Sequence, residues 1–78
     1  MITAAQFRAA RALLDWSQQR LADSAKVGVV TIRQLEAAAA QPRNATLEVI
    51  RRALEAAGIE FIPENGGGPG VRLQKAAP

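Results

Sequence analysis

Apolar residues recur every three or four positions in two long segments of the chain, and this spacing predicts an amphipathic helix in each. One helix covers about residues 3–14, with Thr3 as its N-cap, and the other about residues 45–57, with Asn44 as its N-cap. Gly58 ends the second helix just beyond its C-cap. The inner faces are formed by Phe7, Ala10 and Leu14 in the first helix and by Leu47, Ile50 and Leu54 in the second.

Between these segments, residues 17–36 have the pattern of two short helices joined by a tight corner. Ser17 is a good N-cap for the first, Lys26-Val27-Gly28 forms the corner, and the second runs from Val29 to about Ala38. A small residue at the crossing, Ala22, lets the two helix axes approach closely. The inward positions are Leu21, Ala22, Ala25, Ile32 and Leu35. Such a pair of helices is typical of the helix-turn-helix, a DNA-binding motif.

After the last helix the apolar spacing changes from helical to alternating, in residues 59–62 and again in residues 71–73. A glycine-rich stretch, residues 65–70, separates them, so the sequence predicts a β-hairpin. A phosphate-binding loop is the competing interpretation of these glycines. It is disfavoured, because no lysine follows the glycines and no helix begins after them.

The chain has 78 residues, which is enough for one small domain. We expect a mainly α fold, a bundle of about four helices followed by the short hairpin. The expected parts are a DNA-binding part over residues 1–58, the hairpin over residues 59–73 and a flexible tail over residues 74–78. Lys75, in the tail, could reach a phosphate. A core of this size is near the lower limit for a self-sufficient fold, so association with a second copy is a natural supplement.

With these segments in place, the chain resembles the Cro/phage-repressor-like (XRE-type) helix-turn-helix transcriptional regulators. The resemblance covers about residues 11–54 and rests on Trp16-Ser17-Gln18, Leu21-Ala22, Val27, Thr31-Ile32, Leu35-Glu36, Pro42 and Thr46-Leu47. It implies a lambda-repressor-like bundle, and it implies an ion pair between Arg11, at the margin of the first helix's apolar stripe, and Glu36. Arg8, one turn earlier, is expected to point outward.

Two positions depart from the family's pattern. Lys26 stands where the family usually has a glycine with positive φ, which predicts strain of roughly 1 kcal/mol in the corner or a different turn. Four alanines, residues 37–40, replace the usual polar, glycine-containing segment after the second motif helix. This helix is therefore expected to run on further than in relatives.

Composition narrows the function classes. The chain has no cysteine and no histidine, which removes the disulfide, the zinc thiolate, the commonest metal ligand and the commonest general base. We therefore expect no enzyme, metal or cofactor. No apolar run approaches the roughly 20 residues that span a bilayer, and the N-terminus lacks the order of a signal peptide, so the expected location is cytoplasmic.

The net charge is +3, and its distribution favours the motif. Residues 1–36 carry five basic and three acidic side chains, whereas residues 37–62 carry three of each. An excess of positive charge around the motif is what a phosphate-facing surface requires. The expected partner is therefore double-stranded DNA.

The geometry of the motif predicts which residues contact DNA, because its second helix enters the major groove while the first crosses the backbone. Gln18 lies at the start of the first motif helix and is expected to donate to a phosphate there. Gln34 suits adenine, and Arg33 suits guanine or a phosphate. The remaining candidates are Val29 and Val30, which suit thymine methyl groups, and Arg43 and Asn44, which suit phosphates.

A second hypothesis comes from the two valines. Paired β-branched apolar residues at the leading end of an exposed helix suit a protein groove as well as they suit DNA. The chain would then be an interaction module that keeps the helix-turn-helix fold, such as an anti-activator or an antitoxin-like protein. The first hypothesis, a repressor that occludes a palindromic operator as a homodimer, is the one the sequence favours.

The hairpin supplies the expected dimer contact. An isolated two-stranded hairpin is only marginally stable, so its apolar residues must be covered by the helices of their own chain or by a second chain. A second chain would also supply the twofold axis that a palindromic site requires. The residues expected in the dimer contact are Ile59, Phe61, Val71 and Leu73.

Overall fold

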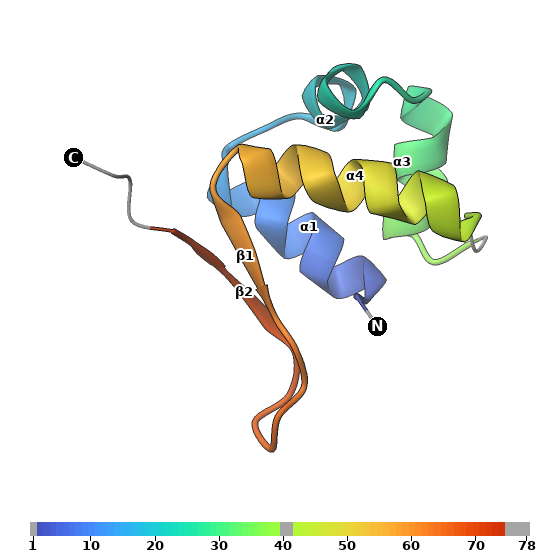
Figure 1. Cartoon of the computed structure of the whole chain (residues 1–78). Coiled ribbons are helices and arrows are strands. Elements are labelled where there is room, and N and C mark those ends of the chain that lie inside the picture. Colours follow the sequence, from blue (N-terminus) through green and yellow to red (C-terminus); the bar gives the residue numbers. More distant parts are fainter. Residues whose placement is uncertain (1, 40–41, 75–78) are drawn as a thin grey trace.

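The computed structural model describes residues 2–39 and 42–74 and has four helices followed by a two-stranded antiparallel sheet (Figure 1). The elements are α1 (Ala4–Leu13), α2 (Gln18–Ala25), α3 (Val29–Glu36), α4 (Asn44–Ala56), β1 (Ile59–Ile62) and β2 (Gly70–Leu73). This architecture confirms the predicted mainly α bundle with a C-terminal hairpin. The expectations for Ala40 and for the tail over residues 75–78, including Lys75, lie outside the described residues.

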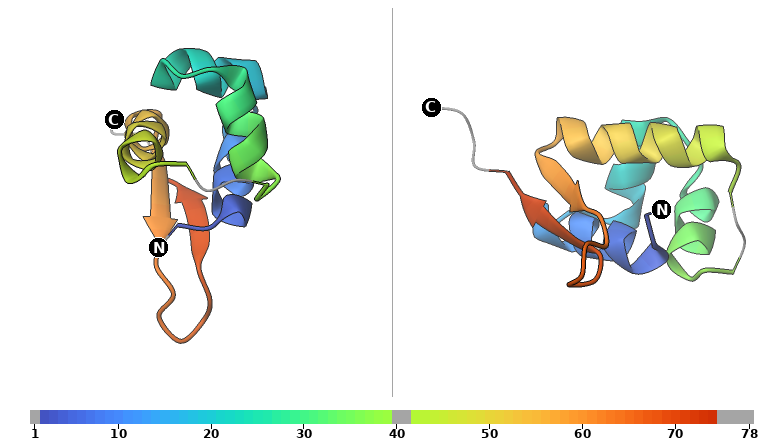
Figure 2. Two further views of the ribbon diagram at one scale, coloured as in Figure 1. Left: turned by 90° about the vertical axis from the view of Figure 1, so that its right-hand side faces the viewer. Right: turned by 60° about the horizontal axis from the view of Figure 1, so that its bottom comes forward.

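Every helix and the first strand contribute to one core. The largest fully buried side chains are Phe7, Leu21, Ile32, Ile50, Leu54 and Ile59. Ala22, on α2, is also fully buried, in agreement with its predicted place where α2 and α3 approach each other. Figure 2 (left) shows α2 above α3, with α4 to one side of α3 and α1 partly behind it. The periodicity thus identified the inward faces, because helices of this size fold only by burying such a stripe.

Three helices end in the same way, on a non-glycine residue with left-handed backbone. Asp15, Lys26 and Ala38 have φ of 57°, 59° and 54°, and each closes the last turn of α1, α2 or α3. In each helix the next residue donates to a carbonyl five positions back, as in a Schellman motif: Trp16 to Arg11, Val27 to Ala22 and Ala39 to Gln34. Lys26 therefore adopts the conformation for which relatives use glycine.

Two expected helix boundaries are wrong. The helix α3 does not run on into the alanines but ends at Glu36, because Ala38 is left-handed and leaves the helical path. Asn44 is not an N-cap: it is the first residue of α4, and Arg43 precedes it as the cap residue without a side-chain hydrogen bond. Arg43 has the extended backbone that is typical of an N-cap residue. Asn44, the next residue, therefore lies inside the helix.

The strands of the hairpin pair Ile59 with Leu73 and Phe61 with Val71. Helices of the same chain cover most of these side chains. Ile59 is buried, Phe61 makes an edge-on contact with the ring of Phe7, and Val71 is half-buried against the core. Only Leu73 remains widely exposed, because it lies at the end of the strand.

Gln6 fastens the hairpin to α1, a role that the sequence analysis missed. Its side-chain oxygen accepts from the N–H of Thr3 (2.8 Å) in a capping box. Its amide nitrogen donates to the carbonyls of Ile62 (3.3 Å) and Gly70 (2.9 Å), which face each other across the hairpin. A buried polar side chain with all of its groups bonded in this way fixes α1 and the sheet relative to each other.

Replacing Ala38 by glycine should raise the free energy of unfolding by about 1 kcal/mol, because glycine adopts a left-handed backbone without a Cβ clash. Chemical denaturation measures the change. The matched control is Ala39→Gly, whose backbone is not left-handed and which should give no gain. An Ala38→Gly protein no more stable than the parent would show that the turn is unstrained.

Candidate nucleic-acid interface

The exposed face of α3 is the candidate base-contacting surface. Val30 is 55% exposed, and Arg33 and Gln34 also face solvent. Val29 differs from the expectation: it is half-buried and packs against the core, so only its partner Val30 projects freely from the first turn. In Figure 2 (left), α3 faces the viewer and α4 is seen from its N-terminal end, so both elements present themselves on one side of the molecule.

Residues expected at phosphates lie at the starts of the two neighbouring helices. Gln18 is the first residue of α2, and Arg43 and Asn44 lie exposed at the start of α4. A helix N-terminus presents free N–H groups and a partial positive charge, both of which favour an anion. The two places therefore suit phosphates on either side of a groove that α3 would enter.

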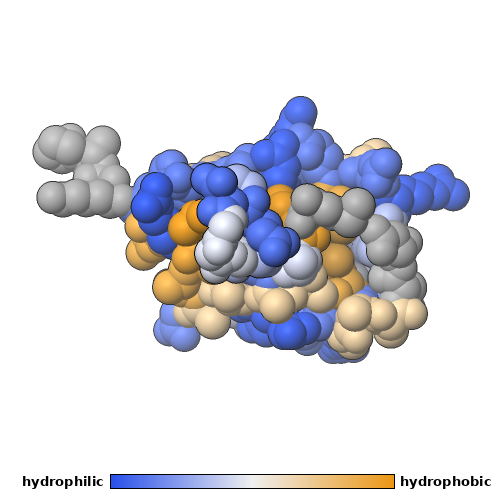
Figure 3. Space-filling model, turned by 90° about the horizontal axis from the view of Figure 1, so that it is seen from below, coloured by the Kyte–Doolittle hydropathy of each residue, from blue (hydrophilic) through white to orange (hydrophobic). Residues whose placement is uncertain are grey.

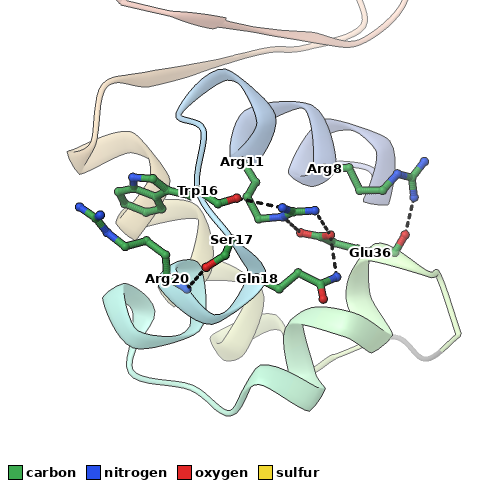
Figure 4. A network of polar contacts seen from close by, with 7 residues as sticks. All are labelled: Arg8, Arg11, Trp16, Ser17, Gln18, Arg20 and Glu36. Atoms are coloured by element: carbon green, nitrogen blue, oxygen red, sulfur yellow. Dashed lines mark hydrogen bonds and ion pairs between the residues drawn. The ribbon is translucent and has the colours of Figure 1, made fainter.

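The expected ion pair between Arg11 and Glu36 is present and locks α1 to the end of α3 (Figure 4). The guanidinium donates from Nε to Glu36 Oε2 (2.8 Å) and from Nη2 to Oε1 (2.9 Å). The Glu36 side chain is 4% exposed and that of Arg11 24%. The hydrogen-bonded carboxylate so close to the guanidinium raises the pKa of Arg11.

Further contacts extend this pair into a network. Arg11 also donates to the carbonyl of Trp16 (2.9 Å), in the link between α1 and α2, and the Gln18 amide donates to Glu36 Oε1 (3.1 Å). Arg8, expected to be merely outward, donates to the backbone carbonyl of Glu36 at the end of α3. Sequence spacing gave no sign of the Arg8 contact, because it joins residues 28 positions apart through the fold.

The side chain and the backbone of Gln18 therefore have different surroundings. Its amide group is held by Glu36, whereas its backbone N–H remains at the open first turn of α2. A phosphate at this helix start would be bound by the backbone N–H and the end of the helix dipole, with the side chain fixed beside it. Ser17, the N-cap, accepts from the N–H of Arg20 (3.0 Å), whose guanidinium lies over the Trp16 ring.

Ion pairing divides the surface into two kinds. All three arginines in α4 and the hairpin, namely Arg51, Arg52 and Arg72, form ion pairs with glutamates. Hydrogen bonds from these arginines hold the pKa values of Glu48 and Glu60 below the ordinary glutamate value. Among the described residues, the cations without an ion pair are Arg8, Arg20, Lys26, Arg33 and Arg43. Four of these five belong to the motif or to the start of α4.

Within residues 2–39 and 42–74 no group of three potential metal-binding side chains occurs. No helix in the same part of the chain is long and apolar enough to cross a membrane.

Together, the crossed α2 and α3, the buried ion pair behind them and the four-helix bundle define a helix-turn-helix domain of the lambda-repressor type. Residues 7–61 match the model of the helix-turn-helix family HTH_3, so the chain belongs to this family, which comprises the XRE, Cro and CI type. Membership implies DNA binding and transcriptional regulation, and the domains of the family are typically non-enzymatic. No curated protein matches the chain.

Replacing Arg11 by methionine should lower the free energy of unfolding by about 3 kcal/mol, because the nearly buried carboxylate of Glu36 loses its counter-charge. Adding Glu36→Leu should restore part of that loss, since the stranded charge is then gone. Arg52→Met, which touches only the rim of the α4 network at 3.4 Å, is the control and should change little. A loss below about 0.5 kcal/mol for Arg11→Met would mean that water reaches Glu36 freely.

Proposed function

We propose that the protein is a sequence-specific transcriptional repressor that binds a palindromic operator as a homodimer. The part over residues 1–58 binds DNA, and the hairpin over residues 59–73 carries the dimer contact. Repression follows by occlusion, since a dimer bound across a promoter excludes polymerase. Family membership supports the DNA binding, and the surface chemistry supports the mode described below.

The observation that carries the proposal is the concentration of unpaired cations around α3. Lys26 at the corner, Arg33 on α3 and Arg43 before α4 have no ion-pair partner among the described residues. Unpaired cations cost little in water, and they gain binding energy by releasing counterions from DNA. The arginines of α4 and the hairpin are paired with glutamates whereas these three cations are not, which is the charge distribution expected of a phosphate-binding face around α3.

Base contacts in this proposal come from three side chains of α3. Gln34 bonds to adenine through its amide, Arg33 bonds to guanine or a phosphate, and Val30 lies against a thymine methyl. Val29 packs against the core beneath the first turn of α3, so only the edge of its side chain can reach a base. Arg43, Asn44 and the start of α2 at Gln18 contact the backbone, which sets the register but carries no sequence information.

The second candidate is a protein-interaction module, and the 55% exposure of Val30 is the observation that favours it. Binding to random duplex DNA at increasing salt separates the two candidates. A DNA-binding protein should lose affinity steeply, because phosphate contacts release counterions. An interaction module should bind random duplex barely at all, even at low salt.

Gln34→Ala and Arg43→Ala should fail in different ways. Gln34→Ala should lose about 1–3 kcal/mol on the preferred operator and little on scrambled DNA, because one base contact per half-site is gone. Arg43→Ala should weaken both DNAs alike and flatten the dependence of log affinity on log salt by about two units in a dimer. Titrations on both DNAs at several salt concentrations measure these effects.

The control for both variants is Val49→Ala. It removes an exposed side chain from the outer face of α4 and should leave DNA binding unchanged. Footprints on the preferred operator should show half-sites about 34–36 Å apart on one face of the duplex. Footprints unchanged by simultaneous alanine substitution of Val30, Arg33 and Gln34 would remove α3 from the groove and favour the interaction module.

A further inference from the structure

We propose that the outer edge of β2 pairs antiparallel with β2 of a second copy of this chain, centred on Arg72, so that two hairpins form one four-stranded sheet. The inference specifies the dimer contact of the proposed function and rests on it. It is argued from the hydrogen-bond pattern of the hairpin, from the exposure of its two edges and from its charges.

The hydrogen-bond pattern shows which backbone groups of β2 are free. Gln74 donates its N–H to the carbonyl of Gly58 (2.6 Å), so these two residues form a hydrogen-bonded pair of the ladder. Bonded and non-bonded pairs alternate in an antiparallel ladder, so Arg72 also bonds to β1, whereas Val71 and Leu73 turn their N–H and C=O groups outward. Within the described residues, no partner occupies these outward groups.

The two edges of the sheet differ in how they are covered. On β1, Ile59 is 1% exposed, whereas its cross-strand partner Leu73 on β2 is 49% exposed. The helix α1 packs against β2 and runs in the same direction as that strand (Figure 1). Seen from below, apolar surface lies beside the pale glycine-rich loop on this side of the molecule (Figure 3).

The register follows from the residues that face outward. Centring the twofold axis on Arg72 places Val71 opposite Leu73 of the second copy, and the reverse, so four backbone hydrogen bonds form. Each Leu73 is then covered by a β-branched partner, which is a favourable cross-strand pair. Pro69 has no N–H and therefore ends the new ladder beyond Gly70.

This register brings the two Arg72 side chains together on the outer face, where like charges would repel. Glu60 reduces this repulsion, because its carboxylate accepts two hydrogen bonds of 2.9 Å each from Arg72. The dimer would carry a row of four charged side chains, with the two arginines in the centre and a glutamate at each end.

Proline at Leu73 tests the edge itself. It removes an N–H that β1 does not use, so the hairpin of each chain keeps its own bonds, but the dimer loses two hydrogen bonds. Sedimentation of the full chain without DNA should show dimerisation weakened about thirtyfold, with an unchanged circular dichroism spectrum. Val49→Lys, an equally exposed apolar position on α4, is the control and should leave the dimer intact.

A cysteine at Arg72 tests the register without relying on the fold of the proline variant. The chain has no cysteine, and a non-bonded antiparallel pair brings its two Cα atoms to about 4.5 Å, close enough for a disulfide. Arg72→Cys should therefore form a covalent dimer under mild oxidation, whereas Ile62→Cys, on β1 of the same face, should not.

The outcomes separate this inference from the proposed function. A dimeric parent protein whose Leu73→Pro variant is folded and still fully dimeric, or whose Arg72→Cys variant does not cross-link, would overturn the β2 contact and leave the dimeric repressor standing. A parent protein that stays monomeric at every concentration would overturn both the contact and the homodimer. DNA binding, measured separately on a single half-site, is independent of either result.

Discussion

The carboxylate of Glu36 is the group on which the arrangement of the motif depends. A charge that is 4% exposed is costly unless it is paired and hydrogen-bonded, and its partners come from different parts of the chain. Arg11 reaches it from α1 and Gln18 from the start of α2, while Arg8 holds the carbonyl of the same residue. Rotating α3 about its axis would break all of these contacts at once, so the orientation of the recognition surface is fixed from behind.

The helix ends show a different balance of forces. Asp15, Lys26 and Ala38 all accept a left-handed backbone that glycine adopts at no cost, and only α4 ends on a glycine, Gly58. Each left-handed residue costs about 1 kcal/mol, but the turn that it closes satisfies carbonyls that a buried helix end would otherwise leave without partners. Sharp turns are needed after α1 and α2, because the next helix begins after only four and three residues, respectively.

Much of this fold could be predicted from the sequence, because the four apolar stripes and the alternation in the hairpin are properties of nearby residues. The errors lie where a tertiary contact or a single backbone angle decides. The end of α3 at Glu36 and the start of α4 at Asn44 depend on local φ values, which a run of alanines or one asparagine does not determine. The hydrogen bonds from Gln6 to the hairpin have a partial signal in the sequence, since Thr3 and Gln6 have the spacing of a capping box. The bond from Arg8 to Glu36 has none.

Ion pairs are distributed unevenly over the surface, and this distribution affects what each part of the surface can bind. Exposed ion pairs contribute little to stability, so the pairing of Arg51, Arg52 and Arg72 with glutamates is a weak explanation of why this small fold holds together. Its stronger effect is on association. A surface that meets DNA needs unpaired cations, whereas contact between two copies of one surface is disfavoured when that surface carries an excess of unpaired cations, because the two like-charged surfaces repel. The glutamates of α4 and β1 pair with the arginines of α4 and β2, while Lys26, Arg33 and Arg43 stay unpaired around α3.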